Sequence, residues 1–293
     1  MLTIKRLIDC PLADAVQAWN KGFEDYMIPL AFPTDFFVAR MGMEGLSATH
    51  SVIAYMDGEP AGLIMNGIRV VGGKKIGWNG GTAVVPDYRK NGVGSAMMEE
   101  SLRIYKEEGA ELATLEAIFG NDKAIRVYER LGYTEVDRLV YLELAGGRVE
   151  AATAVEGLSL RVGKPQEAAK LPFYRHDAAW QTQWQSVRDG EAVFLEQGGR
   201  VVGYCFFKRG YDAEANHTAS TVFQSVVEDA YQGDRKDAIR LMLSQAFQSE
   251  HDIHMRAFHM SAAKDGEAME VMQQMGLQYV RELLNMTKPL VGA

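Results

Sequence analysis

The stretch GTAVVPDYRKNGVGSAMMEES, residues 81 to 101, contains the pattern that decides the fold. An apolar, strand-like run ends at Val85, a loop with glycines at positions 92 and 94 follows, and apolar residues then recur at helical spacing from Val93. A loop between a strand and a helix presents backbone N–H groups to a bound anion, because the first amides of a helix have no partner within it. The stretch therefore predicts a phosphate-binding loop.

Two other glycine-rich loops do not fit these residues. A P-loop needs a lysine followed by serine or threonine after its last glycine, whereas Gly94 is followed by Ser95 and Ala96. A dinucleotide-binding loop needs a small residue where Met97 stands. A third interpretation stays open, that of a glycine-rich turn that merely starts a helix.

The segments around the loop predict a mixed α/β fold. Their order is strand, two helices, three strands, helix, strand, helix, strand. Strands are expected at residues 4–7, 51–55, 60–71, 75–85, 112–117 and 136–144, and helices at 11–23, after Pro33, at 93–109 and at 122–131.

A weaker copy of this pattern follows in the second half. Residues 124–133 and 268–277 match each other at a constant offset of 144 positions. Upstream of the second match, a strand at 158–162, a hairpin at 193–208 and a helix at 237–247 repeat the order of the first half. The repetition predicts a duplicated fold.

Length and composition agree with two folded domains. The chain has 293 residues, of which 47% are hydrophobic and 24% are charged, ordinary values for a folded protein. A small, weakly patterned segment separates the two copies. We therefore expect a first domain at 1–147, a linker at 148–157 and a second domain at 158–293, each domain with its own mostly antiparallel sheet.

Charge and cysteine content exclude several classes of partner. The net charge is −8 and no run of lysine and arginine occurs, so neither nucleic acid nor a membrane surface is an expected partner. The N-terminus is interrupted by charges, and no apolar run has the length of a membrane span. Cys10 and Cys205 form neither a disulfide framework nor a metal pair. We expect a cytoplasmic protein without a metal, and the oligomeric state stays open.

A specific resemblance arises when the loop is considered together with a second pattern. The pattern RxxGxG at residues 89–94 and the pattern NxxAIxxYxxLGY at residues 121–133 resemble motifs A and B of the GCN5-related N-acetyltransferase (GNAT) family. The resemblance covers residues 1–144 and is strongest in 82–133. It implies two tandem domains of the GNAT fold, acetyl-CoA as co-substrate, and transfer of the acetyl group to a primary amine of a small molecule or peptide.

The resemblance also implies which residues bind the coenzyme. Loop amides hold the pyrophosphate, main-chain groups at the end of the preceding strand pair with the pantetheine arm, and an asparagine contacts the coenzyme. The residues implied are Val84, Val85, Arg89, Lys90, Asn91, Gly92, Val93, Gly94, Ser95 and Asn121.

Tyr128 is the candidate general acid. The resemblance places it next to the thioester sulfur. Independently, aminolysis of a thioester expels a thiolate, which a phenol with a pKa of about 10 can protonate. A packing role stays open, because Ala124, Val127, Tyr128 and Leu131 form an apolar stripe at helical spacing.

Glu116 is the candidate base. It lies twelve positions before Tyr128, and in family members that acetylate protein N-termini a glutamate at this distance serves as base. The alternative is a solvent-facing strand residue, because Leu115 and Glu116 point to opposite faces. The base can also act through a water molecule.

Two aromatic residues are candidates for the substrate pocket. Tyr26 lies where the first helices of this family wall the acceptor pocket, and Trp78 enters the strand that leads to the loop. The sequence does not distinguish contact with a substrate from closure of the core.

The second copy is expected to be degenerate. The offset of 144 places Met272 opposite Tyr128 and Met260 opposite Glu116, and neither methionine can transfer a proton. Asp265 stands opposite Asn121. The favoured function is thus an acetyltransferase with one active domain. The alternative is a catalytically weak module that binds or senses acyl-CoA.

Overall fold

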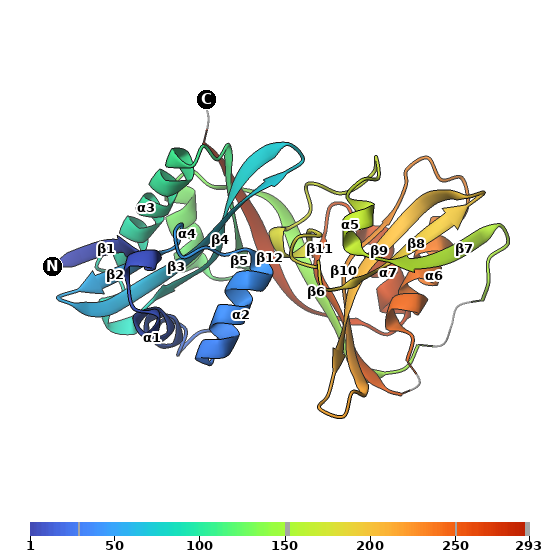
Figure 1. The fold of residues 1–293 in the computed structure, drawn as a ribbon, viewed down its shortest axis with the longest axis horizontal. Coiled ribbons are helices and arrows are strands. Elements are labelled where there is room, and N and C mark those ends of the chain that lie inside the picture. Colours follow the sequence, from blue (N-terminus) through green and yellow to red (C-terminus); the bar gives the residue numbers. More distant parts are fainter. Residues whose placement is uncertain (29, 150–152, 250, 291–293) are drawn as a thin grey trace. The chain divides into compact units, whose positions relative to one another are not determined.

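A computed structural model describes residues 1–28, 30–149, 153–249 and 251–290 (Figure 1). Positions 150–152 of the expected linker lie outside the described residues. The chain forms two compact units. The first contains Met1–Val136 together with the residues from Asn285 onward, and the second contains Asp137–Leu284.

The first unit has the order of elements predicted from the sequence up to its last helix, whereas the last expected strand, at 136–144, lies in the second unit. Its strands are β1 (Leu2–Arg6), β2 (Val52–Met56), β3 (Glu59–Val71), β4 (Lys74–Val84), β5 (Leu112–Ile118) and the end of β12 (Gln278–Pro289), adjacent in that order. Its helices are α1 (Leu12–Gly22), α2 (Thr34–Glu44), α3 (Val93–Glu107) and α4 (Asp122–Arg130). Figure 1 shows α1 and α2 on one side of these strands and α3 and α4 on the other.

Strand β4 contains a bulge at two consecutive glycines. Asn79 pairs with Asn66 and Thr82 pairs with Ile64, so that Gly80 and Gly81 lie opposite the single residue Met65 and β4 has one additional residue. The parallel pairing of β4 with β5 covers only residues 76–79 of β4. Beyond the bulge the two strands therefore separate, and the residues that follow on each strand are released from pairing with one another.

The second unit repeats this arrangement. Its strands are β6 (Thr134–Gly147), β7 (Leu158–Gly163), β8 (Glu191–Gln197), β9 (Arg200–Tyr211), β10 (His217–Val227), β11 (Ile253–Ser261) and the start of β12. Its helices are α5 (Pro165–Ala168), α6 (Arg235–Phe247) and α7 (Gly266–Gln274).

The duplication predicted from the sequence is confirmed by these elements. Strands β10 and β11 are parallel neighbours, as β4 and β5 are in the first unit. Helices α4 and α7 both have 9 residues, and their first residues, Asp122 and Gly266, are 144 positions apart. The mixed α/β class is confirmed as well.

The expectation of a separate sheet in each half is wrong, because β1 to β12 form a single 12-stranded sheet in which β12 lies between β5 and β6. Strand β12 belongs to both units, because its residues up to Leu284 lie in the second unit and those from Asn285 lie in the first. Glu111, next to β5, accepts a hydrogen bond from the amide of Leu290 at 2.9 Å. The C-terminal end of the described chain thus completes the first unit.

Candidate active site

The loop before α3 has the properties of an anion site. Helix α3 begins at Val93, with no side chain capping its N-terminus and no acidic residue in its first turn. Gly92 has a φ of +78°, a left-handed conformation that favours glycine. A Cβ atom on Gly94 would meet only Val84, at an ordinary 3.5 Å. The fold therefore does not require glycine at position 94, and its small size keeps the amides of the first turn accessible to a pyrophosphate.

Arg89 fixes this loop to the rest of the unit rather than extending from it. Its guanidinium forms two hydrogen bonds of 2.7 Å with the carboxylate of Asp25 and one of 3.0 Å with the carbonyl oxygen of Gly22. Its Nε donates to the carbonyl oxygen of Val84 at 3.0 Å. The ion pair lowers the pKa of Asp25. Arg89 thus holds the loop in place by its side chain.

The other residues expected at the coenzyme lie along the same loop. Lys90 and Asn91 are exposed, Val93 is buried, and Ser95 is half-buried. Both main-chain groups at the strand end have partners within the unit. Val85 donates its N–H to Ala61, and the carbonyl of Val84 accepts from Arg89 as described. A carbonyl oxygen has two lone pairs, so Val84 retains one for a further donor.

Glu116 lies on β5, directly after the last residue that pairs with β4. It is half-buried, and the indole Nε1 of Trp78 donates a hydrogen bond of 2.7 Å to its Oε2 atom. Trp78 itself is 1% exposed. The structure thus brings the candidate base and this candidate substrate residue together. Trp78 contacts the site through its N–H group, and its ring is buried in the unit.

The surroundings of Glu116 raise its pKa to about 7. Burial is the largest cause, because removal from water disfavours the charged form. The hydrogen bond from Trp78 acts in the opposite direction, while the Glu44 carboxylate raises the pKa and the Arg40 guanidinium lowers it. A carboxylate with a pKa of about 7 is suited to take a proton near neutral pH.

Tyr128 lies on α4 and is 9% exposed. Burial raises its pKa to about 12, and a hydrogen bond with the side chain of Thr82 acts against this increase. The ring of Tyr133 contacts it edge-on, with 6.2 Å between the ring centroids. The predicted helical stripe is thus present, and Tyr128 has in addition a polar partner on β4.

Asn121 and Tyr26 meet in the structure. The Asn121 side chain caps α4 by accepting from the amide of Ala124 at 3.4 Å. Its Nδ2 donates to the Tyr26 hydroxyl at 3.3 Å. Tyr26 also raises the pKa of Tyr128 electrostatically. Two residues far apart in the sequence therefore lie in one group with the candidate acid.

Sequence reasoning missed Asn79, Thr82, Arg40 and Glu44. Arg40 and Glu44 form an ion pair of 2.9 Å on α2, and Arg40 also donates to the carbonyl of Gly80 at 2.6 Å. Two adjacent glycines within a strand are a recognised signal of a bulge, which would have pointed to this part of β4. Nothing in the residues of α2 indicates a position near Glu116.

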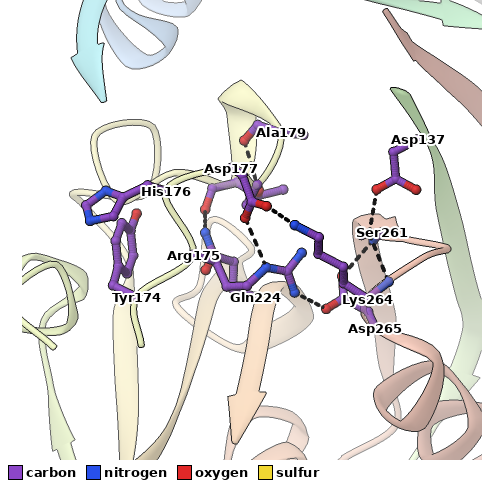
Figure 2. A network of polar contacts seen from close by, with 12 residues as sticks. Asp137, Tyr174, Arg175, His176, Asp177, Ala179, Gln224, Ser261, Lys264 and Asp265 are labelled. Carbon is purple, nitrogen blue, oxygen red and sulfur yellow. Dashed lines mark hydrogen bonds and ion pairs between the residues drawn. The ribbon is translucent and has the colours of Figure 1, made fainter. Parts of the chain in front are cut away.

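The second unit has a different arrangement where the first has Asn121. Figure 2 shows a network of polar contacts around Arg175 and Asp265. Arg175 donates to Asp265 at 2.7 Å, and the amide of Ser261 donates to the same carboxylate at 2.6 Å. Lys264 pairs with Asp177 in this network. Asp265 is therefore occupied by contacts within its own unit.

The second unit also lacks counterparts of the candidate base and the candidate acid. Met260 and Met272, which match Glu116 and Tyr128, are both fully buried. A short 3-10 helix, Trp180–Thr182, lies against both β10 and β11.

Among the described residues no cluster that could hold a metal ion is present, and no helix is long and apolar enough to cross a membrane.

Comparison with known proteins agrees with this geometry. Residues 13–133 match the model of the acetyltransferase (GNAT) family. N-alpha-acetyltransferase 30 of Schizosaccharomyces pombe is 36% identical over 64 residues, which are 22% of this chain and 43% of that protein. N-alpha-acetyltransferase MAK3 of Arabidopsis thaliana is 35% identical over 63 residues, 22% of this chain and 33% of that protein. The chain thus spans less than half the length of these relatives.

Several solved structures resemble the whole chain, among them the following two. A GCN5-related N-acetyltransferase from Sphaerobacter thermophilus has a TM-score of 0.69 at 16% identity, covering 100% of this chain and 96% of the other. A tandem GNAT protein from the clavulanic acid biosynthesis pathway has a TM-score of 0.63 at 11% identity, covering 100% of both chains. At these identities the likeness shows the fold. Residues 13–133 therefore match the GNAT acetyltransferase family, and the whole chain has the fold of a tandem GNAT protein.

Proposed function

We propose that the first unit transfers an acetyl group from acetyl-CoA to a primary amine of a small molecule or peptide. The observation that carries the proposal is Glu116, a half-buried carboxylate with a pKa raised to about 7, at the point where β4 and β5 separate. The match of residues 13–133 to the GNAT family supports an acyl-CoA co-substrate. Bound acetyl-CoA supplies the acetyl group as a thioester.

The loop residues bind the co-substrate in this proposal. The amides of Gly92, Val93, Gly94 and Ser95 face the pyrophosphate, because the start of α3 has neither a side-chain cap nor an acidic residue. Arg89 fixes the loop through Asp25, and Asn121 and Val84 contact the rest of the coenzyme. Lys90 and Asn91 are exposed beside the phosphates.

Glu116 and Tyr128 move the protons. Glu116, directly or through a water molecule, takes a proton from the attacking amine. The amine nitrogen forms a bond to the acetyl carbon while the carbon–sulfur bond breaks. Tyr128 gives its proton to the departing sulfur, so that the products are an amide and a thiol. Trp78 orients the Glu116 carboxylate through the 2.7 Å hydrogen bond.

The pKa of the base favours a weakly basic acceptor. Deprotonating an α-amine with a pKa near 7.8 at pH 7 costs about 1 kcal/mol, whereas a lysine-like amine with a pKa of about 10.4 costs about 4.6 kcal/mol. A carboxylate with a pKa of about 7 is therefore better suited to deprotonate an α-amine than a lysine-like amine. The partial similarity to two N-alpha-acetyltransferases supports the same class of acceptor.

A thiol-release screen tests the proposal. The protein is incubated with acetyl-CoA and with small amines, amino acids or short peptides with free N-termini, and both free thiol and acetylated product are measured. We expect thiol release that depends on an amine and rises with pH through about 7. Coenzyme binding without transfer to any acceptor would favour a module that senses acyl-CoA. Absence of coenzyme binding would exclude both functions.

A further inference from the structure

We propose that Asp25 is a positioning residue that holds residues 23–26, the wall segment of the acceptor pocket, against the coenzyme loop through Arg89. This inference rests on the proposed function and concerns the acceptor side of the same site. It follows from the hydrogen bonds between these two side chains and from the contacts of Tyr26, the next residue in the wall segment.

The guanidinium of Arg89 joins three parts of the first unit. Its two terminal nitrogens each donate to one carboxylate oxygen of Asp25, both at 2.7 Å. A two-point contact of this kind fixes the orientation of both groups. The same guanidinium donates to the carbonyl oxygens of Gly22, at the end of α1, and of Val84, at the end of β4, at 3.0 Å each. Asp25 is thus held at a defined place beside the strand that leads into the loop.

Packing restrains the end of α1 more than it restrains Asp25. A Cβ atom on Gly22 would lie only 2.7 Å from the Cβ atom of Ala83, so the helix and β4 are in close contact there. Three residues later the side chain of Asp25 is 57% exposed. Because few atoms surround that side chain, the ion pair with Arg89 supplies a restraint on the wall segment that packing does not.

Tyr26 extends from the wall segment to the start of α4. The Oδ1 atom of Asn121 accepts from the N–H group of Ala124, so the NH₂ group of the same amide faces the Tyr26 hydroxyl, 3.3 Å away. A phenol oxygen that accepts from this group keeps its own proton for another acceptor. Tyr26 therefore has a donor available for a molecule that enters the pocket.

This place puts Tyr26 on the side of the candidate acid. Asn121 and Tyr128 are seven positions apart and so lie on the same face of α4. A restraint on Tyr26 thus acts on the part of the acceptor pocket that adjoins Tyr128. Loosening the restraint should weaken binding of the acceptor, while the proton-transferring groups and the amides of the coenzyme loop stay in place.

Asp25→Asn tests the inference, because it keeps the shape of the side chain and removes its charge. Exposed ion pairs have modest effects, so we expect the KM for the amine acceptor to rise roughly two- to fivefold. The kcat and the affinity for coenzyme A, measured by calorimetry, should change little. Without any acceptor, hydrogen exchange of the backbone amides at 23–28 should become faster. The matched control is Glu24→Gln, which removes the same charge from an exposed neighbour and should behave like the parent protein.

A double-mutant cycle with Arg89→Gln separates positioning from direct attraction of the amine cation by Asp25. If Asp25 acts through Arg89, adding Asp25→Asn to Arg89→Gln should raise the acceptor KM no further. A further rise would show that the carboxylate attracts the amine itself and would overturn the inference.

The two measurements also distinguish this inference from the proposed function. An unchanged acceptor KM in Asp25→Asn would overturn the inference and leave the proposed function intact. Absence of turnover with every amine would refute the proposed function instead. Equal amide exchange at 23–28 in the parent and in Asp25→Asn would overturn the inference whether or not turnover is seen.

Discussion

The two units of the chain share an order of elements and differ in what lies where their parallel strands separate. In the first unit Glu116 and Tyr128 lie beside this opening, and the loop before α3 has uncapped amides. In the second, Asp234 caps α6, and Met260 and Met272 stand at the positions of Glu116 and Tyr128. The fold is therefore preserved without these titratable groups, because packing requires only apolar volume at positions where the proposed catalysis requires titratable side chains.

The polar side chains at the corresponding place in the second unit form contacts within that unit. Asp265, which matches Asn121, pairs with Arg175, and burial raises the pKa of its carboxyl. A buried pair of this kind is costly to break, because either partner would remain as an uncompensated charge. The difference between the units shows that one scaffold leaves the amides at the start of α3 uncapped in one copy and uses the corresponding polar positions for internal contacts in the other.

The largest expected effect is on coenzyme binding. A calorimetric titration of the parent protein should saturate at one equivalent of coenzyme A per chain. Gly94→Glu should abolish this binding, because a carboxylate at the start of α3 repels the pyrophosphate. The matched control is Gln232→Glu, which adds the same charge to the exposed loop of the second unit and should bind normally. Saturation at two equivalents would contradict the division between the units.

A second expected effect concerns the acid. Tyr128→Phe should lower turnover roughly 10²-fold or more with little change in coenzyme affinity, because the lost proton acts on the transition state. Tyr133→Phe is the matched control. The Tyr133 hydroxyl is buried and has no hydrogen-bond partner in the described part of the chain, so its removal should leave turnover nearly unchanged. Unchanged turnover in Tyr128→Phe would return Tyr128 to a packing role.

A third, smaller effect concerns the base. Trp78→Phe removes the donor to Glu116, so the pKa of that carboxyl should rise above its value of about 7. Less of the base is then deprotonated at pH 7, and turnover there should fall roughly tenfold. At pH 9 the base is deprotonated in both proteins, so the deficit should largely disappear. A deficit of equal size at both pH values would indicate damage to packing instead.

The smallest effect is on stability. A raised carboxyl pKa means that the folded state holds a proton that the unfolded state has released between about pH 5 and pH 7, so stability falls as pH rises through this window. Glu116→Gln removes this cost. Its melting temperature should exceed that of the parent at pH 8 by roughly 2–4 °C, the shift that about 1 kcal/mol produces. The advantage should vanish at pH 5. An equal difference at both pH values would show that ionisation of Glu116 is not its cause.

Local patterns were sufficient to predict most elements of the first unit. The proline before α1, the helical spacing after Val93 and the glycine that follows α4 each act over a few residues, and α1, α3 and α4 have nearly the predicted bounds. The motif residues Asn121 and Tyr128 were found because their spacing along one helix is encoded in the sequence. How they bind the co-substrate stays a prediction.

Contacts between distant segments could not be predicted in the same way. Three contacts join residues from different elements. Arg89 forms an ion pair with Asp25, and Trp78 donates a hydrogen bond to Glu116. Arg40 and Glu44 act electrostatically on Glu116. Sequence periodicity indicates which face of a strand a residue occupies, and not which side chain meets it there. Trp78 shows this limit of sequence analysis. The sequence around a tryptophan does not reveal whether its indole stacks on a substrate or donates a hydrogen bond.

The place of β12 in the first unit has a consequence for folding during synthesis. The residues from Asn285 onward belong to the first unit, yet they are synthesised after every residue of the second. The first unit therefore leaves the ribosome with an open sheet edge beside β5, a site prone to wrong pairing until the final strand arrives. Closing the sheet at β5 joins segments far apart along the chain, the kind of pairing that slows folding. The half that we propose to carry the chemistry is thus completed only after the second unit has been synthesised.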